Sequence, residues 1–326
     1  MNLASEKPIR HALFPLLLAI CCAGAAMPQA LTKSGGLVAY SVAGVLTIRS
    51  ASGRTLRTFR TTPPIGTFAI SPDARSIVFA PPGPAPMHNG GQLYLLSIAT
   101  GKIRRLTHAP AYEKWDAYAY PDYSPRGDEV VFAIHSQLGP VPVDGDDLAT
   151  DAGPFAMLDI RTGAVKILSS TLNIGGQGTA YGSSARWSPN GTRIFLNLED
   201  DFVLVDPAGN QLQDTSKWTH SGTLAVGWLG DECVVYIGGS NWKTGQPARV
   251  LNLISHKTGS LDKLLGVPSK QVTNLVDFSP AIQVRQAPGG LIVHSASGTW
   301  SVTDPERYPD DRVLSTKNVQ IPTSCR

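Results

Sequence analysis

Short runs of alternating apolar and polar residues fill the chain between Gly36 and Val302. The stretch from Phe68 to Thr107 shows the pattern most clearly, with four such runs separated by a Ser-Pro-Asp turn, a long irregular loop and an Ala-Thr-Gly-Lys turn. Runs of this length that are rich in Val, Ile, Leu, Phe and Tyr and bounded by Gly, Pro, Asn and Asp are typical of β-strands. Because no helical pattern exceeds two turns, the sequence predicts an all-β protein.

The same order of strands and turns recurs along the chain. Ser-Pro turns precede the runs SIVFA, EVVFAIH and RIFLNL, and Gly230-Asp231 and Ser279-Pro280 mark two weaker copies. A second series of glycine turns follows each opening. Together the turns define six units, at 36–60, 67–108, 119–169, 184–215, 224–265 and 273–303. We expect a C-terminal strand within 313–321 to complete one of the end units.

A repeat of about 40–50 residues that holds four strands is typical of a β-propeller. One four-stranded sheet cannot cover its own faces, whereas sheets arranged radially cover one another. The prediction is a six-bladed β-propeller with four-stranded antiparallel blades, which occupies residues 26–326 as one domain. A parallel β-helix and a β-sandwich are the competing all-β interpretations, and the four-strand repeat favours the propeller.

The repeated pattern S-P-[D/N/R], an apolar strand, a second strand and T-G-x-x-x-x-L resembles the WD40-like (PD40) repeat. That repeat is found in TolB-type propellers and in the propellers of prolyl-oligopeptidase-family enzymes. The resemblance extends over 36–302 and implies a propeller, but little about function, because propellers have many activities. The chain has no G-x-S-x-G nucleophile elbow and no room for an extra domain between residues 26 and 36. We therefore expect the propeller without the additional domains of those proteins.

The first 25 residues have the pattern of a secretory signal. Lys7 and Arg10 precede the apolar run 12–22 and the small residues 23–26, so we expect cleavage after Ala25 and a periplasmic or secreted protein. A lipoprotein signal that uses Cys21 or Cys22 is the alternative. No apolar run of membrane-spanning length follows, which predicts no membrane span once the signal is removed.

Charge and cysteine content limit the partners. The chain has 28 basic and 25 acidic residues, and loss of residues 1–25 leaves 26 and 24. This near balance argues against a polyanion such as nucleic acid as a partner. Cys233 and Cys325 would remain, and they could pair in an oxidising compartment; the alternative is that Cys233 is an ordinary buried strand residue. We expect a monomer.

The longer connections are expected at one end of the propeller. In antiparallel blades the Ser-Pro and Thr-Gly turns fall at one end of the sheets, and the irregular loops fall at the other end, which we call the loop-rich face. Loops on a rigid scaffold commonly carry function, and aromatic rings beside carboxylates and amides are typical of glycan or peptide recognition. The candidate ligand-binding residues are Tyr112, Trp115, Asp116, Tyr118, His135, Trp218, His220, Asn241 and Trp242.

These features favour an exported binding module for a protein, peptide or cell-wall glycan, with no cofactor. The alternative hypothesis is a secreted lyase or hydrolase whose catalytic or metal-binding residues converge on the channel, with His135, His220 and Asp116 as first candidates. The acidic segment 144–151 lacks the EF-hand order of ligands, and the histidines do not have metal-ligand spacing. The sequence therefore predicts no metal site.

Overall fold

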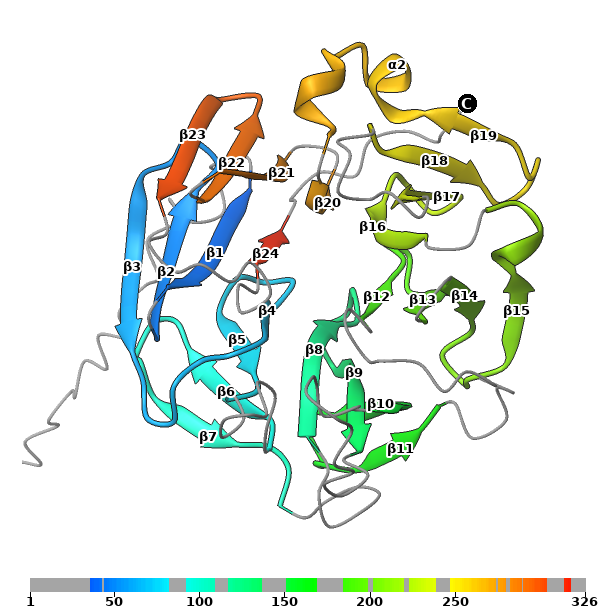
Figure 1. Cartoon of the computed structure of the whole chain (residues 1–326). Helices are drawn as coiled ribbons and strands as arrows, with labels where there is room; N and C mark the ends of the chain where they lie inside the picture. The colour runs from blue at the N-terminus through cyan, green and yellow to red at the C-terminus, as the bar shows by residue number, and fades with distance from the viewer. Residues whose placement is uncertain are drawn as a thin grey trace, which may run out of the picture.

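The structure is a computed structural model of the chain. It describes residues 36–42, 44–81, 92–108, 117–136, 151–168, 184–198, 202–219, 223–238, 247–273, 275–279, 282–288, 290–303 and 314–317. The described chain is built almost entirely of β-strands, which stand in sheets around a common centre (Figure 1). The predicted all-β class and the four-stranded antiparallel sheets are confirmed.

Four of the sheets have four strands each. The first orders β24 (Leu314–Lys317), β1 (Leu37–Val42), β2 (Val45–Ser50) and β3 (Thr55–Arg60) from the centre outward. The second contains β4 (Phe68–Ile70), β5 (Ser76–Phe79), β6 (Tyr94–Ser97) and β7 (Ile103–Arg105). The third contains β8 (Ala117–Tyr123), β9 (Glu129–Ser136), β10 (Asp151–Asp159) and β11 (Val165–Ile167). The fourth contains β12 (Ala185–Trp187), β13 (Ile194–Asn197), β14 (Phe202–Val205) and β15 (Gln211–Asp214).

The remaining strands form one eight-stranded sheet that consists of two antiparallel halves. One half contains β16 (Leu224–Trp228), β17 (Cys233–Ile237), β18 (Arg249–Asn252) and β19 (Thr258–Ser260). The other contains β20 (Leu275–Ser279), β21 (Ile282–Ala287), β22 (Gly290–Ser295) and β23 (Gly298–Thr303). A single parallel residue pair, Gly227 with Phe278, joins β16 to β20. A side chain at Gly227 would collide with the Phe278 carbonyl oxygen, so glycine permits this close approach.

The described helices are short: η1 (Thr215–Lys217), α2 (Leu261–Leu265) and η3 (Ser269–Gln271). Helix α2 ends at Gly266, whose φ of 65° is the left-handed conformation that glycine accepts at a helix end. Within the described residues, none of these helices has the length and apolar character needed to cross a membrane.

In the Ser-Pro turns the serine side chain stabilises the turn as well as the proline ring. Ser71, Ser124 and Ser188 are buried, and each hydroxyl accepts a hydrogen bond from the backbone N–H five residues later, at 2.9, 3.1 and 3.0 Å. Each hydroxyl also donates to the side chain of an Asp or Asn in the same turn. The serine thus satisfies a backbone donor where the next strand begins. These turns and the glycine turns join the strand pairs that the sequence predicted.

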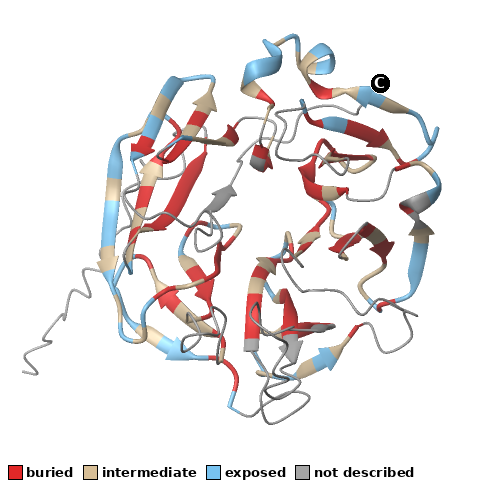
Figure 2. Cartoon of the chain, viewed as in Figure 1, coloured by how far each residue is buried: buried red, intermediate tan, exposed pale blue. Residues whose placement is uncertain are grey.

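The core lies between neighbouring sheets rather than in one central layer (Figure 2). Six clusters of buried apolar side chains alternate with the sheets, and each cluster takes residues from two successive sheets or half-sheets. The last cluster joins β21 and β22 to β1, so the packing returns to the N-terminal sheet. Each sheet is therefore covered on both faces, as a propeller requires.

The C-terminal strand β24 completes the N-terminal sheet. It pairs antiparallel with β1, with Leu37 opposite Lys317 and Tyr40 opposite Leu314. It occupies the central edge of that sheet and contacts β4 and β20. The prediction that a strand within 313–321 completes an end unit is confirmed, and it explains why the first unit lacks a Ser-Pro turn.

Candidate functional site

The central strands β24, β4, β8, β12, β16 and β20 bring residues from distant parts of the chain together (Figure 1). Contacts run from β24 to β4, from β4 to β8 and from β8 to β12, and also from β16 to β20 and back to β24. Polar side chains on these strands are therefore candidates for a site at the centre of the molecule.

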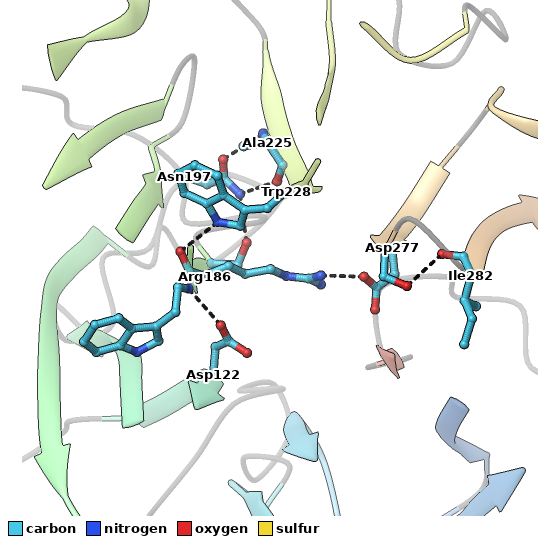
Figure 3. A network of polar contacts seen from close by, with 10 residues as sticks. Asp122, Arg186, Asn197, Ala225, Trp228, Asp277 and Ile282 are labelled. Carbon is cyan, nitrogen blue, oxygen red and sulfur yellow. Dashed lines mark hydrogen bonds and ion pairs between the residues drawn. The ribbon is translucent and has the colours of Figure 1, made fainter. Parts of the chain in front are cut away.

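An ion pair spans the centre between β12 and β20. Nη1 of the Arg186 guanidinium donates a hydrogen bond to Oδ1 of Asp277, although β16 lies between their two strands in the ring of central strands (Figure 3). The side chain of Asp277 is only 1% exposed, whereas that of Arg186 is 28% exposed. The carboxylate is therefore buried more deeply than the arginine side chain that pairs with it.

The surroundings of Arg186 hold it in the charged form. Burial alone would lower the pKa of its guanidinium, but the charge and hydrogen bond of Asp277 and the charge of Asp122 raise that pKa above its ordinary value. Arg186 is therefore a permanent cation at the centre, matched by two carboxylates.

A distorted segment of β8 positions Asp122. Tyr120 has a φ of 50°, which is unusual for a residue with a side chain, and the pairing of β8 with β9 shifts between Ala119 and Asp122. The Tyr120 N–H donates to the Thr67 hydroxyl at 2.9 Å, and Oδ2 of Asp122 accepts the Trp187 N–H at 2.9 Å. The bulge thus connects β8 to the sheets on both sides.

Two further contacts attach the fourth sheet to β16. The buried amide of Asn197 accepts from the Ala225 N–H at 2.9 Å and donates to the Ala225 carbonyl at 2.8 Å. The indole N–H of Trp228 donates to the Arg186 carbonyl at 3.3 Å (Figure 3). Arg186 is therefore held through its backbone as well as through its side chain.

The centre can orient a small polar group. Oδ2 of Asp277 is buried and accepts no hydrogen bond from the described residues, so it suits a ligand or water that donates one. Within the described part of the chain, no group of three His, Cys, Asp or Glu side chains is placed to hold a metal ion.

Three of the sequence-predicted site residues lie in the described chain. Tyr118 is fully buried and packs against Phe132, with 4.9 Å between ring centroids, so it is a core residue and not an exposed binding ring. Trp218 is partly buried and stacks on His256 at 4.0 Å. His135 lies in β9, opposite Ala117 and Ala152. Tyr118 and Trp218 belong to different apolar clusters, so the structure does not bring these two rings to one site.

The other predicted site residues, Tyr112, Trp115, Asp116, His220, Asn241 and Trp242, lie outside the described residues. The acidic segment 144–150 and Cys325 also lie outside them. Cys233 is buried and disulfide-bonded, so it is not a free strand thiol. The predicted pairing of Cys233 with Cys325 stays a prediction.

Sequence reasoning did not select Asp122, Arg186 or Asp277. Each lies in a short apolar strand run, YAYPDY, SARWSP or LVDFSP. A charged residue inside a buried central strand is itself a signal, because an unpaired charge there would be costly. The sequence of one strand does not indicate which charged residue elsewhere in the chain pairs with it.

Comparison with known proteins supports the fold and leaves the family open. No protein-family model matches the sequence, and no curated protein matches it. An oligogalacturonate lyase in complex with manganese aligns with a TM-score of 0.51 and 10% identity, over 82% of this chain and 73% of that one.

Two further solved structures are similar. An oligogalacturonate lyase from Vibrio parahaemolyticus has a TM-score of 0.48 and 12% identity, over 82% of this chain and 74% of that one. A protein of unknown function from Bacteroides thetaiotaomicron has a TM-score of 0.49 and 13% identity, over 88% of this chain and 68% of that one. At these identities the likeness shows a propeller-like all-β fold alone, and the resemblance to the PD40 repeat stays a prediction.

Proposed function

We propose that this chain is an exported six-bladed β-propeller that binds a protein, peptide or glycan at its loop-rich face. Six blades follow if the eight-stranded sheet is divided at the single parallel pair between Gly227 and Phe278, since each half has four antiparallel strands. The six apolar clusters that alternate with the sheets support the same count.

Two observations support export. Residues 1–25 combine basic residues, an apolar run and small residues in the order of a secretory signal. Cys233 is disulfide-bonded, and disulfides persist mainly in oxidising compartments. The periplasm and the extracellular space are such compartments.

The observation that carries the binding proposal is the unequal length of the connections at the two ends of the sheets. The described turns after β4, β8, β12 and β16 and those after β6, β10, β14 and β18 are short and hydrogen-bonded. Because antiparallel strands alternate, the longer segments 81–91, 109–116, 137–150 and 169–183 join strands at the opposite end. A rigid ring with variable loops at one end is typical of a binding surface.

A lyase or hydrolase is the second candidate function. The structural likeness to an oligogalacturonate lyase in complex with manganese favours it, and the buried acceptor on Asp277 gives a polar centre to build on. Against it, the two carboxylates described at the centre already have partners, since Asp277 pairs with Arg186 and Asp122 accepts the Trp187 N–H. Asp116 and His220, the other candidates, lie outside the described residues.

The binding proposal can be tested on the mature chain with soluble peptidoglycan fragments, neutral β-glucan oligosaccharides and a hexapeptide library. Trp115→Ala and Trp242→Ala together should weaken binding of the selected ligand at least tenfold without a change in Tm. Leu212→Ala is the matched control, because Leu212 is an exposed apolar residue, 47% exposed, on the outer strand β15. Unchanged binding by the double variant would contradict the loop-rich face.

The same preparation separates the two functions. Incubation with oligogalacturonate and Mn²⁺ should release no unsaturated uronate if the chain is only a binding module. Release of that product, and its loss in a His135→Ala variant, would support the lyase instead.

A further inference from the structure

Positive charge is concentrated in the first two sheets, although the whole chain is nearly neutral. Residues 36–108 contain eight Lys and Arg residues and one acidic residue, Asp73. Residues 109–326 contain 17 Lys and Arg and 23 Asp and Glu. The first two sheets are therefore strongly basic, although the net charge of the full chain is small.

Six of these eight basic residues lie in the outer strands of the two sheets or directly before them. β3 is the outermost strand of the first sheet and β7 that of the second, and the two sheets are neighbours (Figure 1). Leu56 and Phe59 of β3 and Ile103 of β7 pack against one apolar cluster, which fixes the two strands beside each other. We call their exposed cations the basic rim: Arg54, Arg57, Arg60, Lys102, Arg104 and Arg105.

In the part of the chain that the structure describes, no carboxylate forms an ion pair with the basic rim. Among the described residues, ion pairs involve Arg75, Arg126 and Arg186, and none involves a residue of the rim. Arg105 donates instead to the carbonyl oxygens of Thr107 and His108, at 2.6 and 3.3 Å, which holds its guanidinium in place without neutralising it. The rim thus presents about six uncompensated positive charges, so it attracts a polyanion.

The polar character of the rim indicates what kind of polyanion fits. Both strands are exposed along their length (Figure 2). The exposed large apolar residues of the described chain lie elsewhere: Leu212 in β15, Ile254 in the turn after β18 and Leu264 in α2. The rim therefore lacks the apolar centre of a stable protein interface and the apolar anchors of a membrane-inserting surface.

The side chains between the cations suit a sugar polymer. Thr55 and Thr58 are exposed between Arg54, Arg57 and Arg60, and their hydroxyls can hydrogen-bond sugar hydroxyls. Five of the six cations are arginines, whose planar guanidinium binds a carboxylate through two parallel hydrogen bonds. In strand β3, Thr58 and Arg60 share one face and Thr55 and Arg57 the other, so each face pairs a hydroxyl with a guanidinium.

We infer that the basic rim binds an acidic polysaccharide through its carboxylates, at a site separate from the loop-rich face. The export part of the proposed function underlies this choice, because an exported protein meets such polymers outside the cytoplasm. Arg57, Arg60 and Arg104 are the residues on which the inference depends most, since they are exposed and make no hydrogen bond to another described side chain.

The test measures binding of the mature chain to alginate, a polymer of uronic acids, with neutral dextran as the control polymer. Arg57→Gln, Arg60→Gln and Arg104→Gln together should weaken alginate binding at least tenfold. The matched control is the triple variant Arg161→Gln, Lys257→Gln and Lys270→Gln, which removes the same charge from exposed positions elsewhere. It should change the affinity less than threefold, and both variants should keep the wild-type Tm.

Salt dependence gives a second readout. Removal of three contacting cations should make the slope of log K against log salt shallower by about 2, by analogy with single-stranded polyanions. The control variant should keep the wild-type slope.

Several results would overturn the inference. They are no alginate binding at low salt, equal losses in the two triple variants, or dextran binding as tight as alginate binding. The mature chain could also bind phosphatidylglycerol vesicles or a DNA duplex at least as tightly as alginate. If the rim variant loses that binding, the rim is assigned to those partners instead. The Trp115→Ala and Trp242→Ala variant should still bind alginate; loss in that variant would place the polymer at the loop-rich face and remove it from the rim.

Discussion

Replacement of Arg186 with Met tests whether the ion pair across the centre holds the sheets together. The change removes the hydrogen-bonding partner of Asp277 and leaves a carboxylate whose side chain is only 1% exposed. Loss of one partner from a buried ion pair costs about 3–5 kcal/mol. Because the Arg186 side chain is 28% exposed, water can replace part of the interaction, and we expect a loss of unfolding free energy near the lower end, about 3 kcal/mol.

The assay is urea unfolding followed by tryptophan fluorescence and circular dichroism. The variant with Arg186→Met and Asp277→Leu together should recover most of the loss, since a buried ion pair replaced by apolar residues is often nearly neutral. A single variant within about 0.5 kcal/mol of wild type, or a double variant less stable than the single one, would show that the ion pair does not hold the sheets together.

Further predictions follow from other contacts. Asn197→Ala leaves the N–H and carbonyl of Ala225 unpaired in the core and should cost about 3 kcal/mol in urea unfolding; a loss below 1 kcal/mol would contradict it. A chain that ends at Thr303 lacks β24 and exposes the edge of β1, so its Tm should fall well below that of a Cys325→Ser control that keeps the strand. Non-reducing peptide mapping should recover Cys233 linked to Cys325, and a reductant should lower the Tm of wild type but not of Cys325→Ser. Burial, and then the charges of Arg285 and Lys270, lower the pKa of His294 in the folded protein. The unfolding free energy should therefore decline as pH falls below about 6.5, the pKa of histidine in the unfolded chain. The decline should be smaller in His294→Asn, whose side chain is not protonated in this range.

Much of the fold could be predicted from the sequence because its signals are local. The Ser-Pro turns are readable since Ser71, Ser124 and Ser188 each satisfy a backbone donor within their own turn. The completion of the first sheet by β24 was also accessible, because a unit with a missing central strand requires one from elsewhere. The sequence could not predict the boundaries of the short strands or the single parallel pair between Gly227 and Phe278. Both depend on how closely neighbouring sheets approach each other.

The central network and the basic rim could not be predicted in the same way. Arg186 and Asp277 are 91 positions apart and meet only when the ring of sheets is complete. Tyr118 follows an aromatic, polar loop in the sequence, yet its alternation within β8 turns it into the core beside Phe132. The net charge of the whole chain concealed the basic rim, because the later sheets are acidic. A count made unit by unit would have found it.

The most direct test of the proposed function is amide hydrogen exchange of the mature chain with and without the ligand selected from the peptidoglycan, glucan and peptide panel. Ligand binding at the loop-rich face should add protection in segments 81–91, 109–116, 137–150 and 169–183, and none in the Ser-Pro and Thr-Gly turns at the other end of the sheets. Protection confined to those tight turns would place the ligand at the wrong end of the propeller and overturn the proposed function.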